Sequence, residues 1–134
     1  DNISKFPDLG PEITQKIIQS AIAVHKYFGP GLLESVYEQC LAIELDKAGL
    51  SLKKQPSLSI DYHGHVIENA YRLDLWVEAK VVVEIKAVDK VLPIHEAQIL
   101  SYMRLSKSPL GLLINFNEKL LKDGVKRFAL TDLQ

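Results

Sequence analysis

The fold is decided by residues 71–86, which read YRLDLWVEAKVVVEIK. Two apolar runs flank the short segment Glu78-Ala79-Lys80, as expected for two strands joined by a hairpin loop. Successive strand residues point to opposite faces of a sheet, so Glu84 and Lys86 should share one face. Charged groups inside an apolar strand are costly to bury unless they are paired or bind a metal. The segment therefore predicts a central hairpin with a polar cluster on one face.

The length of the hairpin loop decides whether this cluster holds two carboxylates. If Asp74 lies opposite Glu84, the loop must contain the three residues Glu78-Ala79-Lys80. A two-residue loop, Glu78-Ala79, would shift the pairing by one residue and turn Glu84 to the opposite face. The three-residue loop predicts a single cluster of Arg72, Asp74, Glu84 and Lys86.

Such a cluster is suited to metal-dependent phosphodiester chemistry. Two carboxylates, Asp74 and Glu84, with a backbone carbonyl (that of Ile85) and waters, fit a hard octahedral ion such as Mg²⁺ or Mn²⁺. The ion would polarise a phosphoryl oxygen and lower the pKa of a bound water. Lys86 could orient or deprotonate that water, or neutralise charge on the phosphate. A purely structural cluster of Arg–Asp and Glu–Lys ion pairs remains an open alternative.

Two helices contribute further candidates. Glu34 lies in the first turn of an expected helix, directly after Gly29-Pro30-Gly31, where it could reach the edge of the sheet and act as a further metal ligand. Acidic residues are also favoured there simply by the helix dipole. In a later helix, His95, Gln98 and Tyr102 line one stripe that could contact substrate. The alternative is a half-buried helix with a capping histidine and a packed tyrosine.

The remaining pattern predicts one α/β (α+β) domain over residues 1–134. Apolar spacing and breaker residues set the expected boundaries. We expect helices over about 13–28 and 32–48 and from 93 to before 109, and strands over 52–62, 66–70, 71–77, 80–88, 110–116 and 125–130.

Composition limits the setting more than the function. The formal net charge is −1, so binding to nucleic acid would need a local basic patch. The single cysteine, Cys40, favours a reducing, cytoplasmic location, and no apolar run is long enough to predict a membrane helix. Residues 1–5 lack an initiator Met and an apolar signal core, so we expect a trimmed or processed start.

Several motifs together resemble a known family. Residues 31–37, Gly-Leu-Leu-Glu-Ser-Val-Tyr, are similar to the signature of the GxxExxY proteins, a family within the PD-(D/E)XK nuclease superfamily. Further matching segments are His25-Lys26, Tyr71-Arg72-Leu73-Asp74, Glu84-Ile85-Lys86-Ala87, His95-Glu96-Ala97-Gln98 and Leu112-Leu113-Ile114-Asn115-Phe116. The resemblance implies a restriction-endonuclease-like core, with a mixed sheet of four to five strands flanked by helices.

The resemblance also implies roles for individual residues. Asp74 and Glu84 resemble the metal ligands of the superfamily, Lys86 its catalytic lysine, and Glu34 the acidic residue of its first core helix. Gln98 and Tyr102 resemble the Gln-x-x-x-Tyr motif of RecB-like exonucleases, which helps to hold DNA. We expect Arg72, His95 and Tyr37 to contact substrate as well. The chain departs from the superfamily pattern at Leu73, where a proline would precede the aspartate.

The sequence leaves three functions open. The first is a Mg²⁺- or Mn²⁺-dependent nuclease that cleaves nucleic acid, with DNA favoured over RNA. The second is a non-catalytic module that keeps the fold and binds nucleic acid or protein, and the third is a hydrolase of smaller phosphate compounds. A domain of 134 residues is small for enclosing a strand, so homo-oligomerisation or a partner supplying the grip is a further hypothesis.

Overall fold

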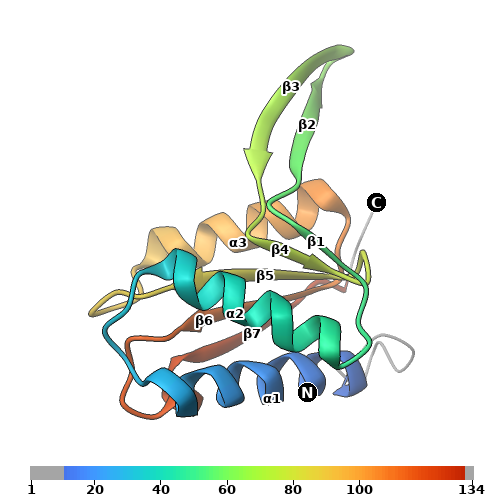
Figure 1. Ribbon diagram of the computed structural model, residues 1–134. Coiled ribbons are helices and arrows are strands. Elements are labelled where there is room, and N and C mark those ends of the chain that lie inside the picture. The colour runs from blue at the N-terminus through green and yellow to red at the C-terminus, as the bar shows by residue number, and fades with distance from the viewer. Residues whose placement is uncertain (1–10, 132–134) are drawn as a thin grey trace.

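The computed structural model describes residues 11–131. These described residues form three α-helices, one short 3-10 helix and seven strands (Figure 1). In chain order they are α1 (Pro11–Phe28), α2 (Glu34–Lys47), β1 (Leu52–Lys54), β2 (Ser57–Tyr62), β3 (His65–Arg72), β4 (Leu75–Val77), β5 (Val81–Lys86), α3 (Pro93–Ser106), β6 (Leu110–Asn115), η2 (Leu121–Gly124) and β7 (Val125–Ala129).

The central sheet has five strands in the order β1-β4-β5-β6-β7. Strands β5 and β6 run parallel, and the other three pairs are antiparallel. A parallel pair needs a long crossover, which α3 supplies between β5 and β6. The prediction of a mixed four- to five-stranded sheet flanked by helices is therefore confirmed.

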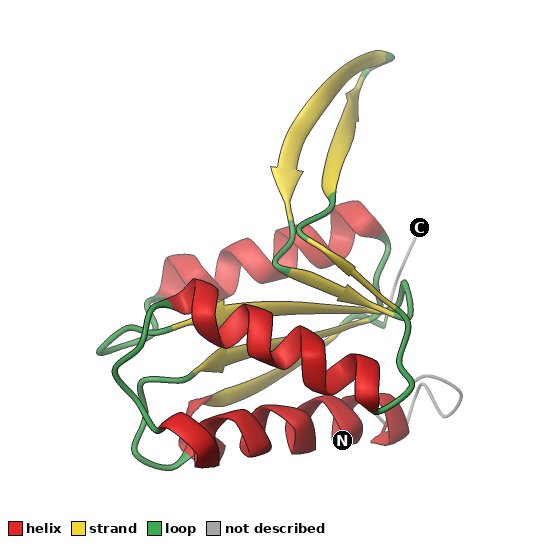
Figure 2. Cartoon of the chain, in the orientation of Figure 1, coloured by secondary structure: helices red, strands yellow, loops and turns green. Residues whose placement is uncertain are grey.

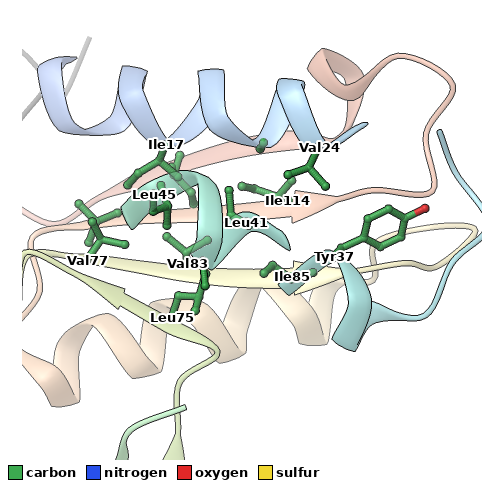
Figure 3. Close-up of a cluster of buried hydrophobic side chains, with 14 of the residues drawn as sticks. Ile17, Val24, Tyr37, Leu41, Leu45, Leu75, Val77, Val83, Ile85 and Ile114 are labelled. Atoms are coloured by element: carbon green, nitrogen blue, oxygen red, sulfur yellow. The ribbon is translucent and has the colours of Figure 1, made fainter. Parts of the chain in front are cut away.

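The two faces of the sheet are covered by different helices (Figure 2). Helices α1 and α2 pack on the face that carries Val83 and Ile85, and Figure 3 shows their apolar side chains meeting those of the sheet. Helix α3 packs through Ile99 and Met103 on the face that carries Val82. Because residues alternate along a strand, Glu84 and Lys86 lie on the α3 face, apart from Val83 and Ile85.

The central hairpin has the register that brings the two acids together. Strand β4 pairs with β5 through Leu75↔Val83, Trp76↔Val82 and Val77↔Val81. The loop is Glu78-Ala79-Lys80, in which Glu78 and Ala79 have positive φ values of 55° and 52°. Positive φ at both central positions is typical of the tight turns that suit twisted hairpins. The predicted three-residue loop is confirmed.

The segment before this hairpin differs from the prediction. Strands β2 and β3 form a separate two-stranded sheet that projects from the body of the molecule (Figure 1). The expected single strand over 52–62 is broken at Gln55-Pro56, because Gln55 has a positive φ of 48° and proline cannot donate a ladder hydrogen bond. The expected strand over 71–77 is likewise divided, with Arg72 ending β3 and Leu75 beginning β4.

Within residues 11–131, no helix combines the length and the apolar character needed to cross a membrane.

Candidate active site

Asp74 and Glu84 meet at a fork in the sheet, where β5 continues beside β6 beyond its pairing with β4. Strand β4 begins at Leu75, so the last residues of β5 pair only with β6. The backbone N–H of Asp74 donates to Oε2 of Glu84 at 2.9 Å. The backbone N–H of Ile85 donates to Oδ2 of Asp74 at 2.7 Å. Each carboxylate therefore receives a main-chain hydrogen bond from the strand segment that carries the other acid, which fixes both side chains at this fork.

Burial makes this pair of acids hard to ionise. Glu84 is only 4% exposed, and burial raises its pKa from 4.5 to about 8. The negative charge of Asp74 acts in the same direction. Burial also raises the pKa of Asp74, against the hydrogen bond from Ile85. Both carboxylates can therefore ionise at this site only at a high cost, unless positive charge lies nearby.

In the described structure, no basic side chain forms an ion pair with Asp74 or Glu84. The positive charges of Lys86 and Arg72 favour the ionised form of Asp74, so both side chains lie within electrostatic range. The ion pairs in the described part of the chain are Lys47–Glu44 and Lys126–Glu96, and neither lies at this site. The alternative of a structural cluster of Arg–Asp and Glu–Lys ion pairs is therefore wrong.

Helix α2 brings two further acids to the fork. The carboxylate of Glu34 accepts a hydrogen bond from the backbone N–H of Ala87 at 3.1 Å, directly after β5. Glu38, one turn later, has a raised pKa, caused mainly by burial and also by Asp74. Glu38 also accepts a hydrogen bond from the side chain of Gln55 at 2.8 Å. The prediction that Glu34 reaches the sheet edge is confirmed, whereas Glu38 is a neighbour that the sequence analysis missed.

Helix α3 contributes Tyr102 on the opposite side. Its ring stacks on Tyr71 with 5.2 Å between centroids. Burial raises the pKa of Tyr102, and the charges of Glu84 and Asp74 raise it further. The nearby side chain of Gln98 acts in the opposite direction and lowers the pKa of Tyr102. These contacts place the Gln-x-x-x-Tyr pair beside the two acids.

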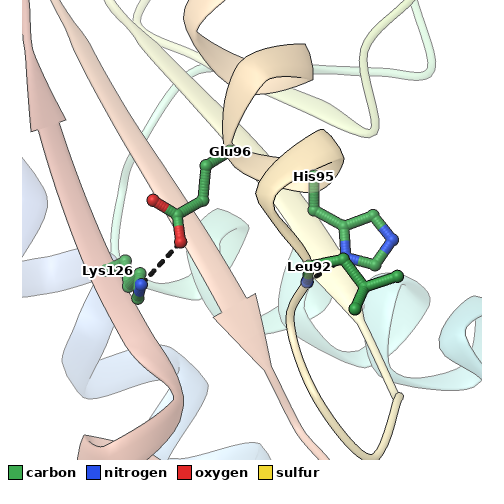
Figure 4. Close-up of polar contacts among 4 residues, drawn as sticks. All are labelled: Leu92, His95, Glu96 and Lys126. Carbon is green, nitrogen blue, oxygen red and sulfur yellow. Dashed lines mark hydrogen bonds and ion pairs between the residues drawn. The ribbon is translucent and has the colours of Figure 1, made fainter.

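His95 serves the start of the same helix. Its Nδ1 accepts the backbone N–H of Leu92 at 3.0 Å (Figure 4). The adjacent Glu96 forms an ion pair with Lys126 of β7 at 2.6 Å, which ties α3 to the far edge of the sheet. His95 therefore has the capping contact that the sequence analysis left open as its alternative role.

The model of one protein family matches residues 11–128, and its description is the PD-(D/E)XK nuclease superfamily. The chain belongs to the PD-(D/E)XK nuclease superfamily. No curated protein and no solved structure matches the chain.

Membership of the PD-(D/E)XK superfamily implies a divalent metal, and the donor set at the fork fits one. Asp74 and Glu84 each use one oxygen for a main-chain hydrogen bond, and the second oxygen of each has no hydrogen bond from the described residues. Carboxylate oxygens suit a hard cation. No group of three or more His, Cys, Asp or Glu side chains within residues 11–131 is close enough to enclose an ion. Glu34 therefore does not join Asp74 and Glu84 as a third acidic ligand in this structure, and water or a main-chain carbonyl would complete the coordination.

One expected contact with substrate is corrected by the structure. Tyr37 is 0% exposed, and its ring stacks on Phe116 with 4.5 Å between centroids. Its hydroxyl donates to the carbonyl of Gly29 at 2.6 Å and accepts the N–H of Leu32 at 3.1 Å. A buried side chain with its hydroxyl engaged in this way cannot lie against a substrate. Tyr37 instead holds the turn that leads to Glu34.

Proposed function

We propose that this protein is a nuclease that hydrolyses phosphodiester bonds of DNA and depends on Mg²⁺ or Mn²⁺. The observation that carries the proposal is the Asp74–Glu84 pair, in which Glu84 is buried and Asp74 half-buried, and which has no ion-pair partner in the described structure. Ionising both acids at this site is unfavourable unless a cation compensates their charge, so the pair is suited to holding one. Membership of a nuclease superfamily gives that cation a catalytic use.

Asp74 and Glu84 would hold the metal, with the main-chain carbonyl of Ile85 as a further donor and Glu34 close enough to orient a water. The metal, when bound, polarises a phosphoryl oxygen and lowers the pKa of water. Lys86 follows Glu84 by two residues on the same strand face, so its ammonium can face the reacting phosphate. It would neutralise charge that develops there, or in its neutral form take the proton of the attacking water.

The side chains around the acids would position the nucleic acid. Gln98 and Tyr102 lie on α3 beside Glu84, and Arg72 ends the projecting β2–β3 arm close to Asp74. An arginine can form two hydrogen bonds to one phosphate, and a tyrosine can stack on a base. Nε2 of His95 has no hydrogen bond within the described residues, so this nitrogen would be free to contact the substrate.

We also propose that the chain belongs to the GxxExxY family within the superfamily. The support is the signature over residues 31–37 and the way its members act here. Gly31, with φ of 110°, belongs to the turn that Tyr37 holds, and Glu34 bonds to the main chain after β5. The signature residues thus connect α1 and α2 with the catalytic strand β5, which carries Glu84 and Lys86.

Cleavage of labelled nucleic acid tests the proposal. Single- and double-stranded DNA, and RNA of the same sequence, would be labelled at one end and incubated with Mg²⁺, Mn²⁺ or EDTA. We expect cleavage of DNA with either metal and none with EDTA. A ladder of internal fragments would indicate endonuclease action, and early release of the end label would indicate exonuclease action. A folded protein that binds Mn²⁺ and DNA but cuts neither would instead be a binding module.

A further inference from the structure

A second group of charged residues lies beside the turn between α1 and α2, and the proposed chemistry does not use it. A surface hollow of about 420 Å³ is formed by the end of α1 and by residues 119–122. Its lining includes Lys26, Lys119 and Lys122, and no acidic residue. All three lysines are exposed. Three positive charges around one hollow form a local basic patch on a chain whose formal net charge is −1.

These lysines form no ion pair in the described structure. The pairs present there involve Lys47 and Lys126. Lys26 lies in the last turn of α1, where a cation is favoured by the helix dipole, but that effect does not account for Lys119 and Lys122. Two separate segments of the chain thus bring positive charge to one place, where it forms no ion pair with another described residue.

The position of the hollow is fixed by a buried contact between its two segments. Nε2 of His25 is hydrogen-bonded to the carbonyl of Glu118 at 2.7 Å, which ties the end of α1 to the segment before Lys119. His25 is itself buried. The lysines are therefore held near one another by folded structure. Between them, the floor of the hollow is apolar, with Ile22 and Leu121.

A short chain of contacts connects the hollow with the catalytic strand. The carbonyl of Lys86 accepts the N–H of Phe116 at 2.8 Å, and Phe116 stacks on Tyr37. The hydroxyl of Tyr37 binds Gly29, which lines the hollow. Lys86 ends β5, and the 119–122 segment follows β6, its parallel neighbour. Ligands of α/β sheets bind outside the carboxyl ends of such strands, so the two sites share one edge.

A second hollow lies at the same edge. It has a volume of about 430 Å³ and is lined by residues 32–35 and by Ala87. Glu34 in this lining bonds to the main chain of Ala87, and Leu33 is 73% exposed. The edge of the sheet from the catalytic strand to the lysines is thus hollowed in two places.

We propose that Lys26, Lys119 and Lys122 form a binding site for the phosphate backbone of the nucleic acid whose scissile bond lies at Asp74 and Glu84. The proposal rests on the proposed nuclease function, and it names the residues that hold the strand on one side of the cut. A nucleic-acid strand carries a negative charge every 3.4 Å or so, which suits several lysines that have no acidic partner. The neutral floor between them can accept sugar or base edges.

The test is a binding measurement under conditions that prevent cleavage. Fluorescence anisotropy of end-labelled single-stranded and duplex oligonucleotides would be recorded in EDTA over a range of salt concentrations. The triple variant Lys26→Ala/Lys119→Ala/Lys122→Ala is compared with the wild type. We expect its affinity to fall at least about tenfold at 0.1 M salt, and its salt slope to decrease by about two to three.

Two further variants separate the site from charge in general. Lys16→Ala/Lys47→Ala/Lys53→Ala removes the same charge from exposed positions, two lining a hollow at the other end of α1 and α2 and one on β1, and should keep wild-type affinity. Lys26→Arg/Lys119→Arg/Lys122→Arg keeps the charge and should also bind normally. All three should unfold at the temperature of the wild type.

The outcomes separate this proposal from the nuclease function. Equal affinity of the first triple variant and the wild type would overturn the proposal, as would equal losses in both alanine triples or no binding by the wild type. If binding depends on the three lysines but the wild type never cuts with Mg²⁺ or Mn²⁺, the proposed nuclease function fails and the binding site stands. If the wild type cuts and binding is indifferent to the lysines, the reverse holds.

Discussion

The backbone N–H of Asp74 donates a 2.9 Å hydrogen bond to the carboxylate of Glu84, so the first acid of the site holds the second in place. Ile85, next to Glu84, returns a 2.7 Å bond to the carboxylate of Asp74. These reciprocal bonds need the one hairpin register in which residues 74 and 84 face each other. Main-chain hydrogen bonds thus hold both carboxylates in position without a ligand, and the nearby positive side chains of Lys86 and Arg72 form no ion pair with them. Preorganised charge of this kind is what a catalytic metal site requires.

Metal binding should stabilise the protein through these two acids. A ligand that binds only the folded state adds about 2.7 kcal/mol of stability at a concentration about 100 times its Kd. We expect Mn²⁺ to raise the melting temperature of the wild type. The melting temperatures of Asp74→Asn and Glu84→Gln should be the same with and without Mn²⁺. The measurement is a calorimetric melting curve with and without metal. Glu68→Gln, on the exposed arm, is the matched control and should respond like the wild type.

Stability without metal should depend on pH because of Glu84. Its pKa is raised from 4.5 to about 8 in the folded state. Below pH 4.5 both states carry the proton, and between pH 4.5 and about 8 only the folded state keeps it. The free energy of unfolding should therefore fall as pH rises through this window and level off above it. Urea unfolding in EDTA at several pH values measures this dependence.

In the same experiment, Glu84→Gln should flatten the fall, because glutamine has no proton to lose. Glu68→Gln should leave it as in the wild type. An equal fall in the wild type and in Glu84→Gln would mean that another group is responsible.

Removing the ammonium of Lys86 should strongly slow cleavage without unfolding the protein. The side chain of Lys86 is half-buried at the end of β5, so Lys86→Ala costs little packing. General acid–base or electrostatic assistance of this kind contributes a factor of about 10² to 10⁴. Single-turnover cleavage should fall by that factor while the melting temperature stays the same. Lys90→Ala, at an exposed loop position, should cut normally, and normal cutting by Lys86→Ala would remove the role given to Lys86.

Tyr37→Phe should destabilise the fold through the loss of one hydroxyl. That hydroxyl is bonded to Gly29 and Leu32, and an unpaired group at a buried position costs about 1–2 kcal/mol. Urea unfolding should show this loss of free energy. Tyr27→Phe removes the same hydroxyl from a ring that is 82% exposed, and should change stability by less than about 0.5 kcal/mol. Equal effects of the two substitutions would contradict the structural role of Tyr37.

The hairpin could be predicted from sequence because its constraints are local. A single alternation of apolar and charged residues fixes the side-chain faces of β5, and the loop length fixes the register. The requirement that Asp74 and Glu84 face each other selected the three-residue loop, which the structure has. Glu34 could be placed at the sheet edge because the Gly-Pro-Gly break fixes where α2 begins.

The features that were missed depend on contacts between distant segments. The alternation over 52–62 predicts one strand but does not reveal that its two parts, β1 and β2, belong to different sheets. Pro56 is the local signal for this division, because proline is disfavoured inside a strand. Glu38 was missed although it follows Glu34 by one helical turn and shares its face. The meeting of Lys26 with Lys119 and Lys122 has no local signal, because it depends on the bond between His25 and Glu118.

Cleavage of end-labelled DNA by matched variants determines whether Asp74 and Glu84 form a catalytic metal centre. Wild type, Glu84→Gln and Glu68→Gln, all shown to be folded, would be incubated with the same DNA and Mg²⁺ or Mn²⁺. We expect cleavage by the wild type and by Glu68→Gln, and none above the EDTA background by Glu84→Gln. Cleavage by Glu84→Gln at the rate of the wild type would contradict this role of the two acids.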